Sequence, residues 1–157
     1  MTMPLEIERK FLVNDQWKNV DKGEGVLYEQ GYLMMEPGKT VRVRLAAEQG
    51  FLTIKGKTTN LSRPEFEYEI PKEDAQTLLD QFCMSKLSKK RYKIAHQGHV
   101  WEVDEFLGDN EGLIMAEVEL SDERESFALP EWIGQEVSKE EKYTNASLSI
   151  HPFKHWR

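Results

Sequence analysis

The sequence predicts a single antiparallel α+β domain, mainly β, that spans residues 1–157. Apolar and polar side chains alternate with a period of two in segment after segment, which is the pattern of β-strands. A clear helical period of apolar residues occurs in one segment. The strand segments do not alternate with helices in the βαβ rhythm of a parallel sheet, so we expect neighbouring strands to be antiparallel.

Length and composition narrow the class of protein. The chain has 157 residues, 39% hydrophobic and 31% charged, as expected of a globular domain with its own core. It has no run of about 18 apolar residues that would predict a transmembrane helix. The charged N-terminal segment does not resemble a signal peptide. A single cysteine, Cys83, rules out an internal disulfide and favours a reducing, cytoplasmic compartment.

The charge balance limits the ligands to be expected. A net charge of −7 argues against nucleic acid, because binding a phosphate backbone requires a basic surface. A small anion needs only a local basic cluster, and a metal ion can supply further positive charge. We therefore expect a small-molecule ligand, with neither nucleic acid nor a membrane as partner. A homodimer is left open, since an apolar outer strand would allow two copies to pair.

The expected elements follow from local patterns. Pro71 near the start and an apolar face that includes Ala75 and Leu79 predict a helix over residues 71–83. Shorter helices are predicted within residues 14–20, 122–127 and 131–133. Strands are predicted within residues 5–13, 30–34, 41–45, 52–55, 65–70, 91–94, 101–104 and 117–120.

The polar face of these strands is almost wholly ionic. One interpretation is a sheet whose salt bridges face water. The other is a sheet closed into a barrel with its ionic faces inward, which removes exposed strand edges. Buried charges need partners, and a metal-bound phosphate would supply both signs. The ionic set comprises Glu6, Glu8, Lys10, Arg42, Arg44, Lys55, Glu65, Glu67, Arg91, Glu102, Asp104, Glu117 and Glu119.

One motif connects the chain to a known family. The run Glu6-Ile7-Glu8-Arg9-Lys10 resembles the ExExK signature of the CYTH superfamily, the triphosphate tunnel metalloenzymes. The resemblance covers nearly the whole chain, and the compact length is similar to the short bacterial inorganic triphosphatase branch. Further matching elements follow in family order, at residues 30–33, 41–44, 53–55, 62–67, 89–92, 102–104, 117–119, 136–138 and 142–145.

The resemblance implies a fold, a cofactor and residue roles. The fold would be an eight-stranded antiparallel closed β-barrel, open as a tunnel, with a few helices packed on its outside. The cofactor would be Mg²⁺ or Mn²⁺. Lys89 and Tyr32 match a lysine–tyrosine pair near the attacked phosphorus. The implied metal ligands are Glu6, Glu8, Glu117 and Glu119, with Glu65, Glu67, Glu102 and Asp104 as further acids. The implied phosphate ligands are Lys10, Arg42, Arg44, Lys55, Arg63, Arg91 and Lys142.

Three functions compete on this basis. The first is metal-dependent hydrolysis of inorganic triphosphate to diphosphate and phosphate, with weak activity on nucleoside triphosphates. The second is class IV-type adenylyl cyclisation of ATP to cyclic AMP. That branch carries a His-Phe segment before the arginine pair, which this sequence does not have. The third is a non-catalytic module that binds polyphosphate.

Overall fold

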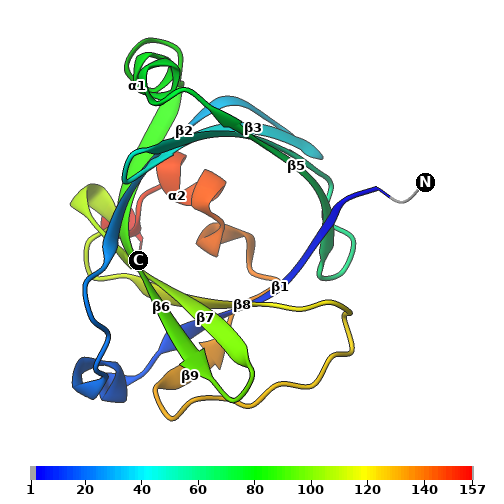
Figure 1. Ribbon diagram of the computed structural model, residues 1–157, viewed down its shortest axis with the longest axis vertical. Helices are drawn as coiled ribbons and strands as arrows, with labels where there is room; N and C mark the ends of the chain where they lie inside the picture. The colour runs from blue at the N-terminus through cyan, green and yellow to red at the C-terminus, as the bar shows by residue number, and fades with distance from the viewer. Residues whose placement is uncertain (1–2, 157) are drawn as a thin grey trace.

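The computed structural model describes residues 3–156, so Met1, Thr2 and Arg157 of the predicted domain 1–157 lie outside the described residues. Within that range, eight antiparallel strands close into a ring in the order β5-β4-β3-β2-β6-β7-β8-β1 (Figure 1). The strands are β1 (Leu5–Val13), β2 (Val26–Glu36), β3 (Lys39–Ala46), β4 (Gln49–Gly56), β5 (Ser62–Ile70), β6 (Ser85–His96), β7 (His99–Phe106) and β8 (Ile114–Glu119).

Strand β1 closes the ring because it pairs on both sides. Its first residues pair with β5, from Leu5 opposite Pro64 to Ile7 opposite Ser62. Its later residues pair with β8, from Glu8 opposite Glu119 to Leu12 opposite Met115. A ninth strand, β9 (Ile133–Glu136), adds to β1 outside the ring. The predicted eight-stranded closed barrel is therefore confirmed.

Much of the hydrophobic core lies between the barrel wall and the segments that cover it. One cluster packs Trp17 of η1 (Asp15–Asn19) and Trp132 against Phe11 and Trp101 of the wall. A second packs α1 (Lys72–Gln81) against β3 and β4. Alternate side chains of a strand point to opposite faces of the sheet. The apolar set therefore faces outward, and the ionic set is left facing inward.

A third cluster fills one end of the barrel. Leu87, Phe106 and Met115 share the inward parity of their strands, and Leu148 of α2 (Asn145–Ile150) packs on them with no exposed surface. In Figure 1 α2 lies within the outline of the ring, whereas α1 lies outside it. The expectation that the helices pack on the outside thus holds for α1, while α2 closes one end of the barrel.

Of the four helices predicted from the sequence, two are present in the structure and two are not. The helix at 71–83 is confirmed as α1, and the turn of helix at 14–20 as η1. The helix predicted at 122–127 is wrong. The segment forms turns there because the Glu123 carboxylate accepts hydrogen bonds from the Leu61 amide and the side chains of Asn60 and Ser62. The helix at 131–133 is also wrong, since these residues turn directly into β9.

Short 3₁₀ helices complete the described chain: η2 (Gly108–Asn110), η3 (Glu141–Tyr143) and η4 (Phe153–His155). Phe153 and Trp156 pack edge to face and join the cluster around Leu148, so the C-terminal segment is held against the end of the barrel that α2 closes. No helix within residues 3–156 has both the length and the apolar character needed to cross a membrane.

Candidate active site

A cavity of about 930 Å³ occupies the interior of the barrel. This placement decides between the two interpretations of the ionic faces, because charged side chains from all eight strands of the ring line its wall. Strand β2 contributes Glu36 at its end and, deeper in the wall, Tyr28 and Tyr32. The predicted site residues that line the cavity are Glu6, Glu8, Lys10, Tyr32, Arg42, Arg44, Lys55, Arg63, Glu65, Glu67, Lys89, Arg91, Glu102, Glu117 and Glu119.

Arginines of β3 and β6, which flank β2 in the ring, create a concentrated positive field on one part of the wall. Burial, together with the neighbouring charges of Arg42 and Arg91, lowers the pKa of Arg44 to about 10. The Nε of Arg42 is buried without a hydrogen-bond partner among the described residues. A buried donor without a partner is costly. This part of the wall therefore suits an anion rich in oxygen atoms, such as a phosphate chain.

Lys89 is fully buried beside this field. Its Nζ lies 2.8 Å from Oδ2 of Asp104 and 2.9 Å from Oδ1 of Asn145. Burial lowers the pKa of Lys89 to about 7; the Asp104 carboxylate opposes this shift, while Arg91 and Arg44 add to it. An amine with a pKa near neutrality can exchange a proton during catalysis. Tyr32, its predicted catalytic partner, lines the same cavity and is 4% exposed.

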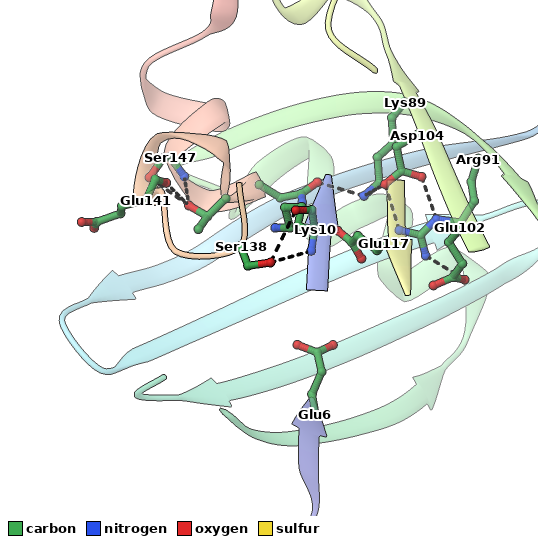
Figure 2. A network of polar contacts seen from close by, with 12 residues as sticks. Glu6, Lys10, Lys89, Arg91, Glu102, Asp104, Glu117, Ser138, Glu141 and Ser147 are labelled. Atoms are coloured by element: carbon green, nitrogen blue, oxygen red, sulfur yellow. Dashed lines mark hydrogen bonds and ion pairs between the residues drawn. The ribbon is translucent and has the colours of Figure 1, made fainter. Parts of the chain in front are cut away.

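Asp104 has a different environment from the one predicted. The Arg91 guanidinium donates to its two oxygens at 2.7 and 2.9 Å, and Lys89 contacts it as well (Figure 2). Although burial opposes it, these two cations hold the pKa of Asp104 well below its ordinary value. Asp104 lies behind the cavity wall as an anchor for Lys89 and Arg91. Its carboxylate is already engaged, which differs from the predicted role of an open metal ligand.

Lys142 also differs from its predicted role. Its Nζ lies 4.6 Å from the centre of the Trp156 ring and 5.3 Å from that of Tyr143. These are cation–π contacts on the C-terminal segment. Lys142 therefore helps to seat that segment and lies outside the set of residues that line the cavity. Arg63 does line the cavity, but its Nε donates to the carbonyl of Gly56 at 3.0 Å.

The carboxylates of β1 and β8 face one another across the strand pair. Glu8 is paired with Glu119, and Lys10 with Glu117. Burial, with repulsion from Glu117 and Glu6, raises the pKa of Glu8 well above its ordinary value. Burial opposes the shift at Glu117, yet Lys10 and then Arg91 lower its pKa to about 2. Glu8 is thus a half-buried carboxyl group that lies among like charges.

This donor set fits a hard divalent cation. Such ions prefer carboxylate oxygens, and a positive ion would relieve the repulsion around Glu8. Within residues 3–156, no three carboxylate, histidine or cysteine side chains are already gathered as a metal-binding group. Lys55 instead lies between two of the acids, 3.0 Å from Glu6 and 3.2 Å from Glu65. The metal-ligand assignments of these acids stay predictions.

The remaining two acids are paired with the arginines. Glu67 accepts a hydrogen bond from Thr53 at 2.9 Å and lies 3.6 Å from Arg42. Glu102 lies 3.2 Å from Nη1 of Arg91. Both side chains are more exposed than Asp104, at 39% and 32% against 2%. They can therefore exchange an arginine for a metal ion or a water molecule at lower cost than Asp104 can.

Sequence reasoning missed the polar residues that support Lys89. Asn145 lines the cavity at the start of α2, and Gln30 of β2 is fully buried beside it. Both lie in segments that match the family pattern, at 30–33 and 142–145. In the sequence, nothing distinguishes an amide side chain in a buried hydrogen-bond network from one in a surface turn. No role is therefore predicted for either residue.

Comparisons with known proteins identify the family to which this fold belongs. The CYTH domain family model matches residues 4–150. A curated inorganic triphosphatase of Acetivibrio thermocellus is 47% identical over 157 residues, 99% of each chain. One of Nitrosomonas europaea is 34% identical, over 92% of this chain and 97% of the relative.

Solved structures lead to the same family. The crystal structure of an inorganic triphosphatase superposes with a TM-score of 0.65 at 30% identity, over 92% of this chain and 97% of that one. The chain therefore belongs to the CYTH domain family, as its sequence motifs predicted.

Proposed function

We propose that the chain is an inorganic triphosphatase, which hydrolyses triphosphate to diphosphate and phosphate. One observation carries the proposal: a barrel of the CYTH family encloses a cavity whose wall holds a buried basic cluster and a set of facing carboxylates. Two curated relatives that align over most of their length are named inorganic triphosphatases, which favours hydrolysis over cyclisation. The cytoplasm is the proposed compartment, in keeping with the single cysteine.

Phosphoryl transfer depends mainly on positioning and charge neutralisation. In our proposal Arg42, Arg44 and Arg91 bind oxygens of the phosphate chain, because they line the cavity and carry charge that burial makes costly to leave unmatched. Lys10 and Lys55 extend this set on the acidic side, where each already contacts a glutamate. The substrate would thus bind between the two walls.

The carboxylates of Glu6, Glu8, Glu117 and Glu119 are proposed to hold Mg²⁺ or Mn²⁺ together with the substrate. When bound, such an ion supplies charge neutralisation on the phosphate oxygens and a Lewis acid for the attacked group. The protein's own task is then to present these acids deprotonated. The raised pKa of Glu8 makes this task pH-dependent in the absence of a cation.

In the chemical step, an oxygen of water forms a bond to a terminal phosphorus and the bridging P–O bond breaks. The bridging oxygen leaves with the electron pair as diphosphate. Neutral Lys89 is proposed to accept the proton of the attacking water, since burial lowers its pKa to about 7. Tyr32 lies on the same cavity wall and is proposed to orient the attacked phosphate.

The test is phosphate release from tripolyphosphate and from ATP, each with Mg²⁺ and with Mn²⁺. We expect strong turnover of tripolyphosphate, weak turnover of ATP and loss of both in Glu8→Ala, whose folding is checked by circular dichroism. Formation of cyclic AMP from ATP would instead favour the cyclase. Tight binding of triphosphate by the folded wild type without turnover would leave a binding module.

A further inference from the structure

The cation Lys89 is held by a chain of neutral amides as well as by a carboxylate. Asn145 Oδ1 accepts from Lys89 Nζ at 2.9 Å and from Gln30 Nε2 at 3.4 Å. Gln30 Oε1 accepts in turn from Arg44 Nε at 3.1 Å. The chain therefore links two cations of the cavity wall, Arg44 and Lys89, which come from different strands.

The burial of these groups makes the chain more than a surface contact. Gln30 and Lys89 have no exposed surface, and Asn145 lines the cavity at the first residue of α2. A buried amide without partners would cost free energy, so each of these hydrogen bonds is needed for the group that makes it. The rotamers of Lys89 and Arg44 are consequently fixed before any substrate arrives.

Because Asn145 and Gln30 are neutral, they can hold Lys89 and Arg44 without cancelling the positive charge that binds phosphate. A lysine ammonium has three donors. At Lys89, Asp104 and Asn145 take two of them; the third is the proton that Lys89 loses when it becomes the neutral base, so the same two acceptors hold both forms. An acid in place of Asn145 would hold Lys89 equally well but would cancel positive charge that a phosphate chain needs. An amide fixes the cation and leaves its charge available.

We propose that Asn145 and Gln30 are positioning residues, which set the place of Lys89 and Arg44 for triphosphate through the hydrogen-bonded chain Arg44–Gln30–Asn145–Lys89. The inference rests on the proposed function and assigns a task to α2 beyond closing the barrel. The first residue of this helix, Asn145, aligns a cation at the reacting end of the site.

The test compares two substitutions at Asn145. Asn145→Ala removes the acceptor, so Lys89 loses its fixed position, and we expect kcat to fall about tenfold or more with KM within about threefold. Asn145→Asp keeps the acceptor and adds a negative charge. At a pH high enough for Lys89 to be neutral in both proteins, it should retain kcat within about threefold and raise KM about tenfold, while the pH at which kcat rises moves upward because the new carboxylate favours the protonated lysine. An acid is also favourable at a helix N-terminus, so Asn145→Asp should fold.

Ser149→Ala is the matched control on the same helix. It removes the hydrogen bond between the Ser149 and Ser85 hydroxyls, at 2.8 Å, outside the cavity. We expect it to leave both constants unchanged. If Asn145→Ala keeps the wild-type kcat, or if both Asn145 variants change kcat and KM alike, the inference is overturned. An inactive wild type would instead refute the proposed function.

Discussion

The buried carboxylate of Asp104 offers a sharp test of how the cavity wall is built. It contacts Lys89 at 2.8 Å and Arg91 at 2.7 and 2.9 Å, and its side chain is 2% exposed. Asp104→Asn keeps the shape but removes the charge, which leaves the buried Lys89 without a carboxylate partner and Arg91 with Glu102 alone. Removal of one partner from a buried ion pair costs about 3–5 kcal/mol. For a domain of this size that corresponds to a fall in Tm of roughly 6–20 °C.

The assay is thermal unfolding followed by circular dichroism at low salt. Glu102→Gln is the matched control, because Glu102 contacts the same Arg91 at 3.2 Å but its side chain is 32% exposed. A more exposed pair contributes about 1 kcal/mol or less. We expect Asp104→Asn to unfold at a much lower temperature than Glu102→Gln. Equal Tm values for the two variants would refute the argument that Asp104 anchors the basic wall.

Three further predictions concern the acid–base group, the metal and the end of the barrel. Because the pKa of Lys89 is lowered to about 7 and its neutral form accepts the proton, kcat/KM should rise as pH increases through 7, and Lys89→Arg should abolish that rise. At 100 times its Kd, Mg²⁺ should stabilise the folded protein by about 2.7 kcal/mol, which calorimetry measures as a rise in Tm. Glu8→Gln should reduce this rise. Leu148→Ala should lower the free energy of unfolding by about 2–5 kcal/mol in urea titrations, since Leu148 has no exposed surface; a change below 1 kcal/mol would contradict the plugged barrel end.

The strands and their ionic faces could be predicted because the period of two is a property of the extended backbone. The direction of those faces could not be derived from alternation alone. It depends on ring closure, which is made by the pairing of Leu5–Ile7 with Ser62–Pro64, more than fifty residues away in the chain. The family resemblance supplied what the local pattern lacked.

Asp104 shows why residue roles are harder to predict than strands. Asp104 and Glu102 have the same parity on β7, and the sequence treats them alike. They differ in depth along the barrel, since Asp104 lies beside Lys89, next to the apolar end, and Glu102 nearer to the open cavity. The position of a side chain along the barrel axis depends on how its strand packs with the other strands, so the local alternation of residues does not predict it.

Helix α2 was missed for a related reason. Its six residues, Asn145–Ile150, are too few to show an apolar period. Its stability comes from Thr144, whose side chain caps the Ser147 amide, and from Leu148, which packs on the barrel end. In contrast, the predicted helix at 122–127 had suitable composition, yet the hydrogen bonds of Glu123 to the loop before β5 outweigh the local preference.

Phosphorus NMR of tripolyphosphate, followed over time with the wild type and Mg²⁺ or Mn²⁺, tests whether the charged interior of the barrel hydrolyses triphosphate with the help of a divalent cation. We predict that the triphosphate signals give way to diphosphate and phosphate in equal amounts, and that a folded Glu8→Gln variant leaves them almost unchanged. Persistence of the triphosphate signals with the folded wild type and either metal would contradict the proposed function.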